Sequence, residues 1–337
     1  MAKQEIFGII GNPLVHSLSP VMHNAAYREM GIDGSYEPFE TDDLRTTIHM
    51  IRDRNIRGVS VTLPFKESVL PLMDDLESDA VRIGSVNTIT NREGRLLGSN
   101  TDWRGLISDL RGRFAIRGKT IAVLGAGGAA RAAAYAVQME GGNPVIVNRT
   151  SARGERVARD FGCAFHPLSE ITNLRASGMI NTTSVGMMPH EDQSPVPAHT
   201  LGRFRWVMDI VYNPQSTRLL REARERGCET VNGIGMFVNQ GAEQIRLWTG
   251  MAAPRELMRG VVEEALRGGG RRTEGGDQRT EIRGQRSEDG GRSRREEDRG
   301  LRSEIRGRRS EVRGRRGERL SAKGIRAVEG FGGTSSE

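Results

Sequence analysis

The chain has 337 residues, 36% of them hydrophobic and 28% charged, with a formal net charge of +7. This length allows two domains that each bury a sizeable core. The sequence shows no metal-ligand spacing among its two cysteines and six histidines, no secretion signal, and no run near the roughly 20 apolar residues of a membrane span. We therefore expect a cytoplasmic protein without a metal ion, and neither export nor membrane insertion.

The segment Ser17-Leu18-Ser19-Pro20 is typical of a helix start. Serine is a favoured N-cap residue, and proline fits the first helical turn because its missing N–H group is not needed there. We therefore expect Ser19 to cap a helix. The free amides and the dipole of a helix N-terminus attract anions, so the hydroxyls of Ser17 and Ser19 suit a substrate carboxylate.

Residues 59–63 alternate small polar and apolar side chains, as a half-buried strand does, and Pro64 ends the pattern. Lys66 then falls just beyond the carboxyl end of this strand, where open α/β sheets bind their ligands. A lysine in that place can act as a general acid or base. Asp102 follows another strand-like run, residues 95–98, and is the natural partner to hold Lys66.

A glycine-rich loop, Gly125 to Ala129, follows the apolar run 120–124 and leads into an Ala-rich, helical segment that ends at Met139. A strand, a Gly-x-Gly-x-x-Ala turn and a helix, in this order, are the setting in which the glycines bind the pyrophosphate of a dinucleotide. The sequence therefore predicts a Rossmann-like unit that begins near this loop.

The next predicted strand, residues 144–147, ends where an NAD enzyme carries the acidic residue that binds the ribose. Asn148-Arg149-Thr150 occupies that place, with Arg153 a turn later and no carboxylate. Two guanidinium groups can form charge-assisted hydrogen bonds to a 2′-phosphate. The sequence therefore favours NADP over NAD as the cofactor.

Together these segments resemble the shikimate dehydrogenase family, and the resemblance runs from about Ile6 to Leu266. Further segments of the family pattern follow in the same order, namely Ser85-Val86-Asn87-Thr88, Asn100-Thr101-Asp102, Asn181-Thr182-Thr183-Ser184-Val185-Gly186-Met187 and Gly235-Met236-Phe237-Val238-Asn239-Gln240. The resemblance implies the reversible NADPH-dependent reduction of 3-dehydroshikimate to shikimate, a step of aromatic amino-acid biosynthesis.

The resemblance also implies a role for each site residue. Lys66 would be the catalytic acid/base, paired with Asp102. The substrate would be bound through its carboxylate by Ser17 and Ser19, through its ring hydroxyls by Thr62, Asn87, Asp102 and Gln240, and from above by Tyr212. NADP would be bound at its pyrophosphate by Gly125, Ala126, Gly127, Gly128 and Ala129, at its adenosine phosphate by Asn148, Arg149, Thr150 and Arg153, and at its nicotinamide by Ile210, Gly233 and Met236. Ser60 departs from the pattern, since many members carry Asn there, and its shorter side chain would make a weaker contact.

These segments also predict the domain organisation. Residues 1–103 and 235–267 would form an α/β substrate-binding catalytic domain, and residues 104–234 a Rossmann-like NADP-binding domain. Hydride transfer would take place in a cleft between the two. The sequence leaves open whether the protein forms a homodimer.

Residues 268–337 form a tail rich in Arg, Glu and Gly, and its 19 basic and 13 acidic residues account for almost all of the net charge. A seven-residue motif recurs at 280–286, 303–309 and 310–316. Because large apolar side chains are scarce, burial cannot offset the entropy of ordering, and we expect disorder. We interpret the tail as a solvated, dispensable extension with at most a weak contact to a polyanion, since interleaved Glu and scarce aromatics argue against specific nucleic-acid binding.

Two alternative functions stay open. One is a quinate/shikimate dehydrogenase that also accepts quinate or NAD, although the serine pair and the arginines at 149 and 153 favour shikimate and NADP. The other is a polyanion- or RNA-associated protein that acts through its basic tail. The first 267 residues argue against the second, because their net charge is only +1 and they predict no basic face.

Overall fold

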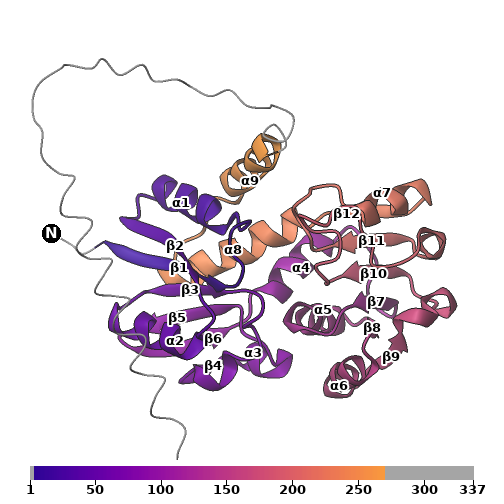
Figure 1. Ribbon diagram of the computed structural model, residues 1–337, viewed down its shortest axis with the longest axis horizontal. Coiled ribbons are helices and arrows are strands. Elements are labelled where there is room, and N and C mark those ends of the chain that lie inside the picture. The colour runs from indigo at the N-terminus through magenta and orange to yellow at the C-terminus, as the bar shows by residue number, and fades with distance from the viewer. Residues whose placement is uncertain (1–3, 270–337) are drawn as a thin grey trace, which may run out of the picture. The chain divides into compact units, whose positions relative to one another are not determined.

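The computed structural model describes residues 4–269. The expected disordered tail therefore lies outside the described residues, apart from Gly268 and Gly269, which end the last helix. Two six-stranded sheets organise the described part of the chain (Figure 1). Within it, no helix combines the length and the apolar character needed to cross a membrane.

The first sheet is mixed and has the strand order β2-β1-β3-β5-β6-β4. Its strands are β1 (Glu5–Gly11), β2 (Gly34–Glu40), β3 (Gly58–Val61), β4 (Asp75–Leu76), β5 (Thr88–Arg92) and β6 (Arg95–Ser99). Strand β1 pairs in parallel with β2 and β3, whereas β5 runs antiparallel to β3 and β6. The helices of this region are α1 (Ser19–Glu29), α2 (Leu44–Asp53), α3 (Ser78–Ile83) and the short 3-10 helix η1 (Leu70–Leu72).

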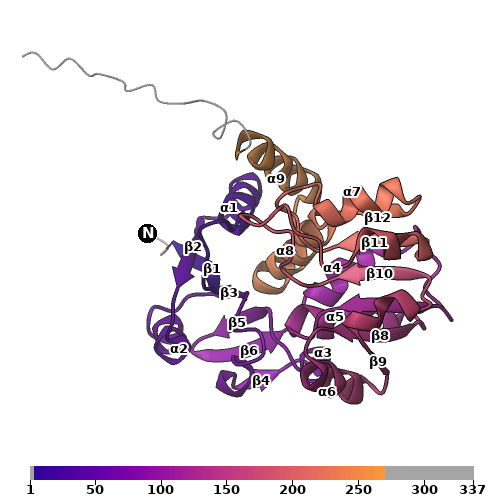
Figure 2. The same cartoon turned by 45° about the vertical axis from the view of Figure 1, so that its right-hand side comes forward.

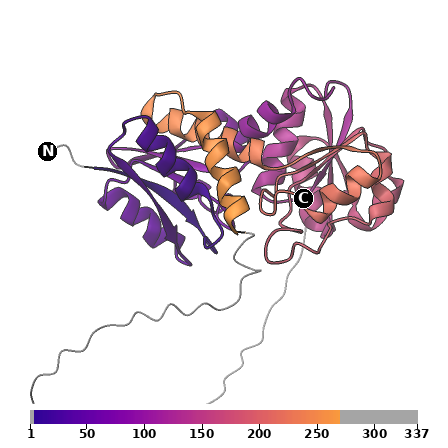
Figure 3. The same cartoon turned by 90° about the horizontal axis from the view of Figure 1, so that it is seen from above.

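Helices cover both faces of the first sheet. Because side chains alternate along a strand, neighbouring residues of β1 belong to different apolar clusters. Phe7 and Ile9 of β1 belong to an apolar cluster with helices α1, α8 (Ile234–Thr249) and α9 (Arg255–Gly269). Ile10 belongs to a second cluster, which includes residues of α2. Helix α9 packs against α1 and α8, so the C-terminal helices lie beside the N-terminal elements, as the orange and indigo ribbons of Figure 3 show.

The second sheet is parallel throughout and has the strand order β12-β11-β10-β7-β8-β9, seen from another side in Figure 2. Its strands are β7 (Thr120–Leu124), β8 (Asn143–Asn148), β9 (Ala164–Pro167), β10 (Gly178–Asn181), β11 (Trp206–Asp209) and β12 (Glu229–Val231). The helices of this region are α4 (Asp102–Leu110), α5 (Gly128–Met139), α6 (Ser151–Phe161), α7 (Arg218–Glu225) and the 3-10 helices η2 (Leu168–Asn173) and η3 (Ala198–Arg203).

Strand β7 is apolar and buried from Ile121 to Leu124 because helices cover both faces of this sheet. Ile121 and Val123 pack in a cluster with residues of α5, while Ala122 and Leu124 pack in a cluster with residues of α7. The strand order reverses at β7, with β8 and β9 on one side and β10, β11 and β12 on the other. The carboxyl ends of β7 and β10 therefore form the switch point at which such sheets bind ligands.

The predicted α/β fold with a Rossmann-like second sheet is confirmed. The expectation that Ser19 caps the first helix is wrong, because α1 begins at Ser19 itself and Leu18 holds the N-cap position without a side-chain cap. The hydroxyl of Ser17 instead accepts a hydrogen bond from the Ser19 amide at 3.3 Å. The reason is local geometry: the side chain two residues before the helix can reach an amide that has no helical partner.

Candidate active site

Lys66 and Asp102 form a close ion pair although they come from different elements. Lys66 follows β3, Asp102 opens α4, and their Nζ and Oδ2 atoms lie 2.6 Å apart. The side chains are only 15% and 6% exposed. The second carboxylate oxygen of Asp102 accepts a hydrogen bond of 2.8 Å from Nδ2 of Asn87. The carboxylate is therefore held from both sides, and it fixes the position of the ammonium group.

Two further side chains, those of Asn100 and Ser85, and the backbone amide of Thr101 hold this pair in place. The Asp102 amide donates to Oδ1 of Asn100 at 3.1 Å, and Nδ2 of Asn100 donates to the carbonyl and the hydroxyl of Ser85, both at 2.9 Å. The amide of Thr101 donates to Oδ1 of Asn87 at 2.7 Å. Asn100 and Ser85 belong to predicted motif segments, but sequence reasoning assigned neither of them a role.

The structure brings Asn87, Asp102 and Gln240, three of the expected substrate residues, together. Nδ2 of Asn87 lies 3.4 Å from Oε1 of Gln240, which places Gln240 beside the Lys66–Asp102 pair. Tyr212 stacks on Phe237 with ring centroids 4.2 Å apart, and burial raises the pKa of its hydroxyl while the neighbouring Ser17 side chain lowers it. Thr62 follows β3 directly, and its amide donates to the carbonyl of Ile10 at 2.9 Å.

A buried hydrogen-bond network leads from Tyr36 to Asn87, beside the Lys66–Asp102 pair, and sequence reasoning missed it. The hydroxyl of Tyr36 donates to Ser60 at 2.6 Å. Ser60 in turn donates to Oε1 of Gln244 at 2.9 Å, and Nε2 of Gln244 donates to the Asn87 carbonyl at 3.2 Å. Both hydrogen-bonding roles of Ser60 are thus used within the protein. The departure of Ser60 from the family pattern was the only signal of this network in the sequence.

The glycine loop lies at the carboxyl end of β7 and starts helix α5. Gly125 has a φ of +116°, and a Cβ added to it would lie 2.6 Å from Oγ1 of Thr182, so no other residue fits. Gly127 holds the N-cap position of α5 and no side chain caps this helix, which suits an anion at its first amides. A Cβ added to Gly128 would lie 2.9 Å from Cβ of Lys66, so the loop and the lysine are immediate neighbours.

The remaining cofactor residues also lie at the carboxyl ends of this sheet. Asn148 ends β8 and donates to the Thr150 carbonyl at 2.9 Å, while Arg149 is exposed. Nη2 of Arg153 lies 3.4 Å from Oε1 of Glu67, the residue next to Lys66, and this pair was not expected.

The three residues expected at the nicotinamide also lie close to one another. A Cβ added to Gly233 would collide with the carbonyl of Ile210, so these two residues touch. Met236 is buried in the same apolar cluster against which Ile210 packs.

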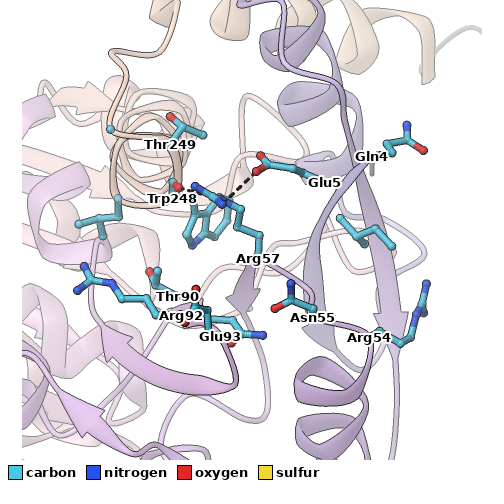
Figure 4. A pocket seen from close by; sticks show the side chains of 14 residues that line it. Gln4, Glu5, Arg54, Asn55, Arg57, Thr90, Arg92, Glu93, Trp248 and Thr249 are labelled. Atoms are coloured by element: carbon cyan, nitrogen blue, oxygen red, sulfur yellow. Dashed lines mark hydrogen bonds and ion pairs between the residues drawn. The ribbon is translucent and has the colours of Figure 1, made fainter. Parts of the chain in front are cut away.

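A pocket of about 640 Å³ lies elsewhere, at the amino end of β1, and contains none of the expected site residues (Figure 4). Arg57 crosses it, pairing with Glu5 at 3.0 Å and donating to the Trp248 carbonyl at 3.3 Å. Within residues 4–269, no group of three or more His, Cys, Asp and Glu side chains is arranged to hold a metal ion.

Comparisons with known proteins agree with this geometry. Residues 9–89 match the family model described as the shikimate dehydrogenase substrate binding domain, and residues 233–263 match that of the shikimate 5'-dehydrogenase C-terminal domain. The chain is similar to the shikimate dehydrogenase (NADP(+)) of Pyrococcus furiosus, with 45% identity over 268 residues that cover 79% of this chain and 97% of that protein.

Solved structures show the same similarity. The shikimate 5-dehydrogenase of Thermus thermophilus, in complex with NADP(H) and shikimate, superposes with a TM-score of 0.72 at 39% identity, covering 78% of this chain and 100% of that chain. The shikimate 5-dehydrogenase of Listeria monocytogenes, in complex with shikimate and NAD, gives a TM-score of 0.71 at 34% identity, covering 78% and 97%. The resemblance predicted from the motifs is confirmed, and the chain belongs to the shikimate dehydrogenase family.

Proposed function

We propose that this chain catalyses the reversible NADPH-dependent reduction of 3-dehydroshikimate to shikimate, a step on the route to chorismate and the aromatic amino acids. The observation that carries the proposal is the Lys66–Asp102 pair, held at 2.6 Å beside the glycine loop at the start of α5. The activity of the relatives, at 45% identity for the Pyrococcus furiosus protein, supports the same reaction.

Substrate binding is assigned to the polar groups around this pair. The hydroxyls of Ser17 and Ser19, at the N-terminus of α1, suit the carboxylate of shikimate because the free amides and the helix dipole also favour an anion there. Thr62, Asn87, Asp102 and Gln240 offer both donors and acceptors for ring hydroxyls. Tyr212 is assigned to close over the substrate, and its proximity to Ser17 supports this role.

Lys66 is assigned as the acid/base of the reaction. In the direction of reduction, negative charge develops on the carbonyl oxygen, and the ammonium of Lys66 donates a proton to it. In the direction of oxidation, neutral Lys66 accepts the proton of the shikimate hydroxyl. Asp102 stabilises the ammonium form and keeps its Nζ atom in one place. NADPH, when bound, supplies the hydride.

The residues of the second sheet fit a dinucleotide. Gly125 to Ala129 are assigned to the pyrophosphate, because they lead into the N-terminus of α5, where no side chain caps the helix and the first amides can bind an anion. Asn148, Arg149, Thr150 and Arg153 are assigned to the adenosine phosphate, and Ile210, Gly233 and Met236 to the nicotinamide. A relative was solved with NAD, so the fold alone does not set the choice of cofactor. We assign the preference for NADP over NAD to Arg149 and Arg153.

The domain boundaries stay as predicted, with residues 1–103 and 235–267 binding the substrate and residues 104–234 binding NADP. The packing of α8 and α9 with residues of the first sheet supports the return of the chain at residue 235. A cytoplasmic location follows from the proposed place in biosynthesis, where NADPH is available. A homodimer and a weak polyanion contact by residues 268–337 stay hypotheses.

The experiment is a steady-state assay of the full chain with shikimate or quinate, each with NADP+ or NAD+. We expect kcat/KM to be highest for shikimate with NADP+, and to fall by about tenfold or more with NAD+, since a charge-assisted hydrogen bond contributes about 1.5 to 3 kcal/mol. Comparable values for shikimate and quinate would favour the broader quinate/shikimate dehydrogenase. No turnover with any of the four combinations would refute the proposed reaction.

A further inference from the structure

Asp209, at the end of β11, is a buried carboxylate outside the residues assigned above. Its side chain is fully buried, and both of its oxygens accept hydrogen bonds. Oδ1 accepts from Nδ2 of Asn181 at 2.9 Å and from the amide of Val211 at 3.1 Å, and Oδ2 accepts from the hydroxyl of Thr217 at 2.7 Å. One side chain thereby connects the ends of two adjacent strands with the start of helix α7.

The partners of Asp209 fit the ionised carboxylate. All three are donors, and an ionised carboxylate can only accept. Among residues 4–269 no arginine or lysine pairs with Asp209, and burial raises its pKa to about 6. A buried charge without a cation destabilises a folded protein. The three hydrogen bonds therefore favour the ionised form of Asp209, whereas its apolar surroundings disfavour that form. Such a conflict is common where function requires a fixed geometry.

The segments that Asp209 connects are those assigned to the cofactor and the substrate. Oδ1 of Asn181 accepts from the amide and the hydroxyl of Thr183, at 3.1 and 2.7 Å, and the methyl group of Thr183 lies 3.4 Å from a Cβ added to Gly125. On the other side, the Val211 amide lies between Ile210, at the proposed nicotinamide site, and Tyr212, at the proposed substrate site.

Thr217 limits the segment at its far end. Its hydroxyl oxygen accepts a hydrogen bond from the Leu220 amide at 3.3 Å and so caps α7 while it donates to Asp209. The stretch from Ile210 to Ser216 is thus held at both ends by the same carboxylate.

We propose that Asp209 is a positioning residue, whose carboxylate holds residues 210–216 so that Ile210 and Tyr212 face the cofactor and the substrate. The inference rests on the proposed function for the roles of Ile210 and Tyr212. Asp209 itself touches neither reactant. Asp209 acts on the site through its hydrogen bond from the Val211 amide. Its buried carboxylate lowers the stability of the fold.

The test is Asp209→Asn in the full chain. Asparagine keeps the shape and an acceptor for Asn181 and Val211, but its NH2 group cannot accept the hydrogen bond of the Thr217 hydroxyl, so that O–H group loses its acceptor. We expect the kcat per folded molecule to fall about 10- to 100-fold, because a small misplacement of a reacting group has effects of this size. We expect KM for shikimate to rise as well. The thermal midpoint should stay equal or rise, since a buried charge is removed.

A matched control is Thr200→Val. Thr200 is also fully buried, lies in the same half of the chain, and donates one hydrogen bond of 2.7 Å, to the Pro197 carbonyl. This variant should lower the thermal midpoint and leave kcat and KM unchanged. If Asp209→Asn does not fold, Thr217→Val removes one of the three donors and is expected to change kcat in the same direction.

Amide hydrogen exchange gives a readout that does not depend on the reaction. In Asp209→Asn, the amides of residues 210–216 should exchange at least about tenfold faster than in the wild type, and those of β7 should not change. If the wild type shows no turnover but this local exchange increases, the proposed function fails and the positioning role stands. Unchanged exchange at 210–216, or a kcat per folded molecule within twofold of the wild type, would overturn the inference.

Discussion

Replacing Lys66 by methionine tests the centre of the proposed mechanism. Methionine keeps an unbranched apolar side chain against Gly128, where Cβ and Cδ of Lys66 lie 2.9 and 3.3 Å from the position of an added Cβ. It removes only the ammonium group and its 2.6 Å contact with Asp102. Asp102 keeps its hydrogen bond from Asn87, so the carboxylate should stay in place.

The expected loss of turnover follows from the role of the proton. A positioned acid/base group contributes about 10² to 10⁴ in rate, which is about 3 to 5 kcal/mol of the activation barrier. Among the groups assigned to the substrate, Asp102 loses its contact with Lys66 but keeps its hydrogen bond from Asn87. We therefore expect kcat to fall by that factor, while the dissociation constant of shikimate changes by less than about fivefold.

The assay is the steady-state oxidation of shikimate at saturating NADP+, with shikimate binding measured separately by calorimetry. Lys119→Met is the matched control, because Lys119 is an exposed lysine just before β7 and away from the site. This control should retain the turnover of the wild type. A kcat of Lys66→Met within fivefold of the wild type would remove Lys66 from the chemistry.

Three further predictions concern the cofactor, the pH dependence and the tail. Arg149→Ala should raise KM for NADP+ about 10-fold or more but KM for NAD+ less than twofold, and equal effects in the same steady-state assay would show that Arg149 does not bind the 2′-phosphate. Burial lowers the pKa of His23 from 6.5 to about 4. Between these pH values the unfolded chain binds a proton at His23 and the folded chain does not. The free energy of unfolding should therefore fall by about 3 kcal/mol as the pH drops from 6.5 to 4. His23→Phe, which can still stack on Tyr36, should flatten that part of the pH profile in chemical denaturation, and an unchanged slope would contradict the assignment. A chain that ends at Gly269 should keep full activity. It should lose retention on a polyanion column, because its formal charge falls to +1. Lost activity with a normal thermal transition would mean that the tail takes part in the reaction.

The sequence by itself determined the second sheet, the glycine loop and the family. Residues 120–124 form β7 as predicted, and α5 starts one residue earlier than expected, because apolar runs, glycines and Ala-rich segments act on neighbouring residues. The pairing of Lys66 with Asp102 was also predicted, since both were placed at the ends of strands and the family pattern joined them. The individual roles of the site residues stay predictions.

Only the tertiary structure decided which distant side chains support the site. Ser60 and Gln244 are 184 residues apart in the chain, and their hydrogen bond depends on how α8 packs against the first sheet. The burial of Asp209 likewise depends on the order β11-β10-β7, which brings Asn181 beside it. Local patterns carry no information on such neighbours, because burial and hydrogen-bond partners are set by strand order and helix packing, which many separate segments decide together.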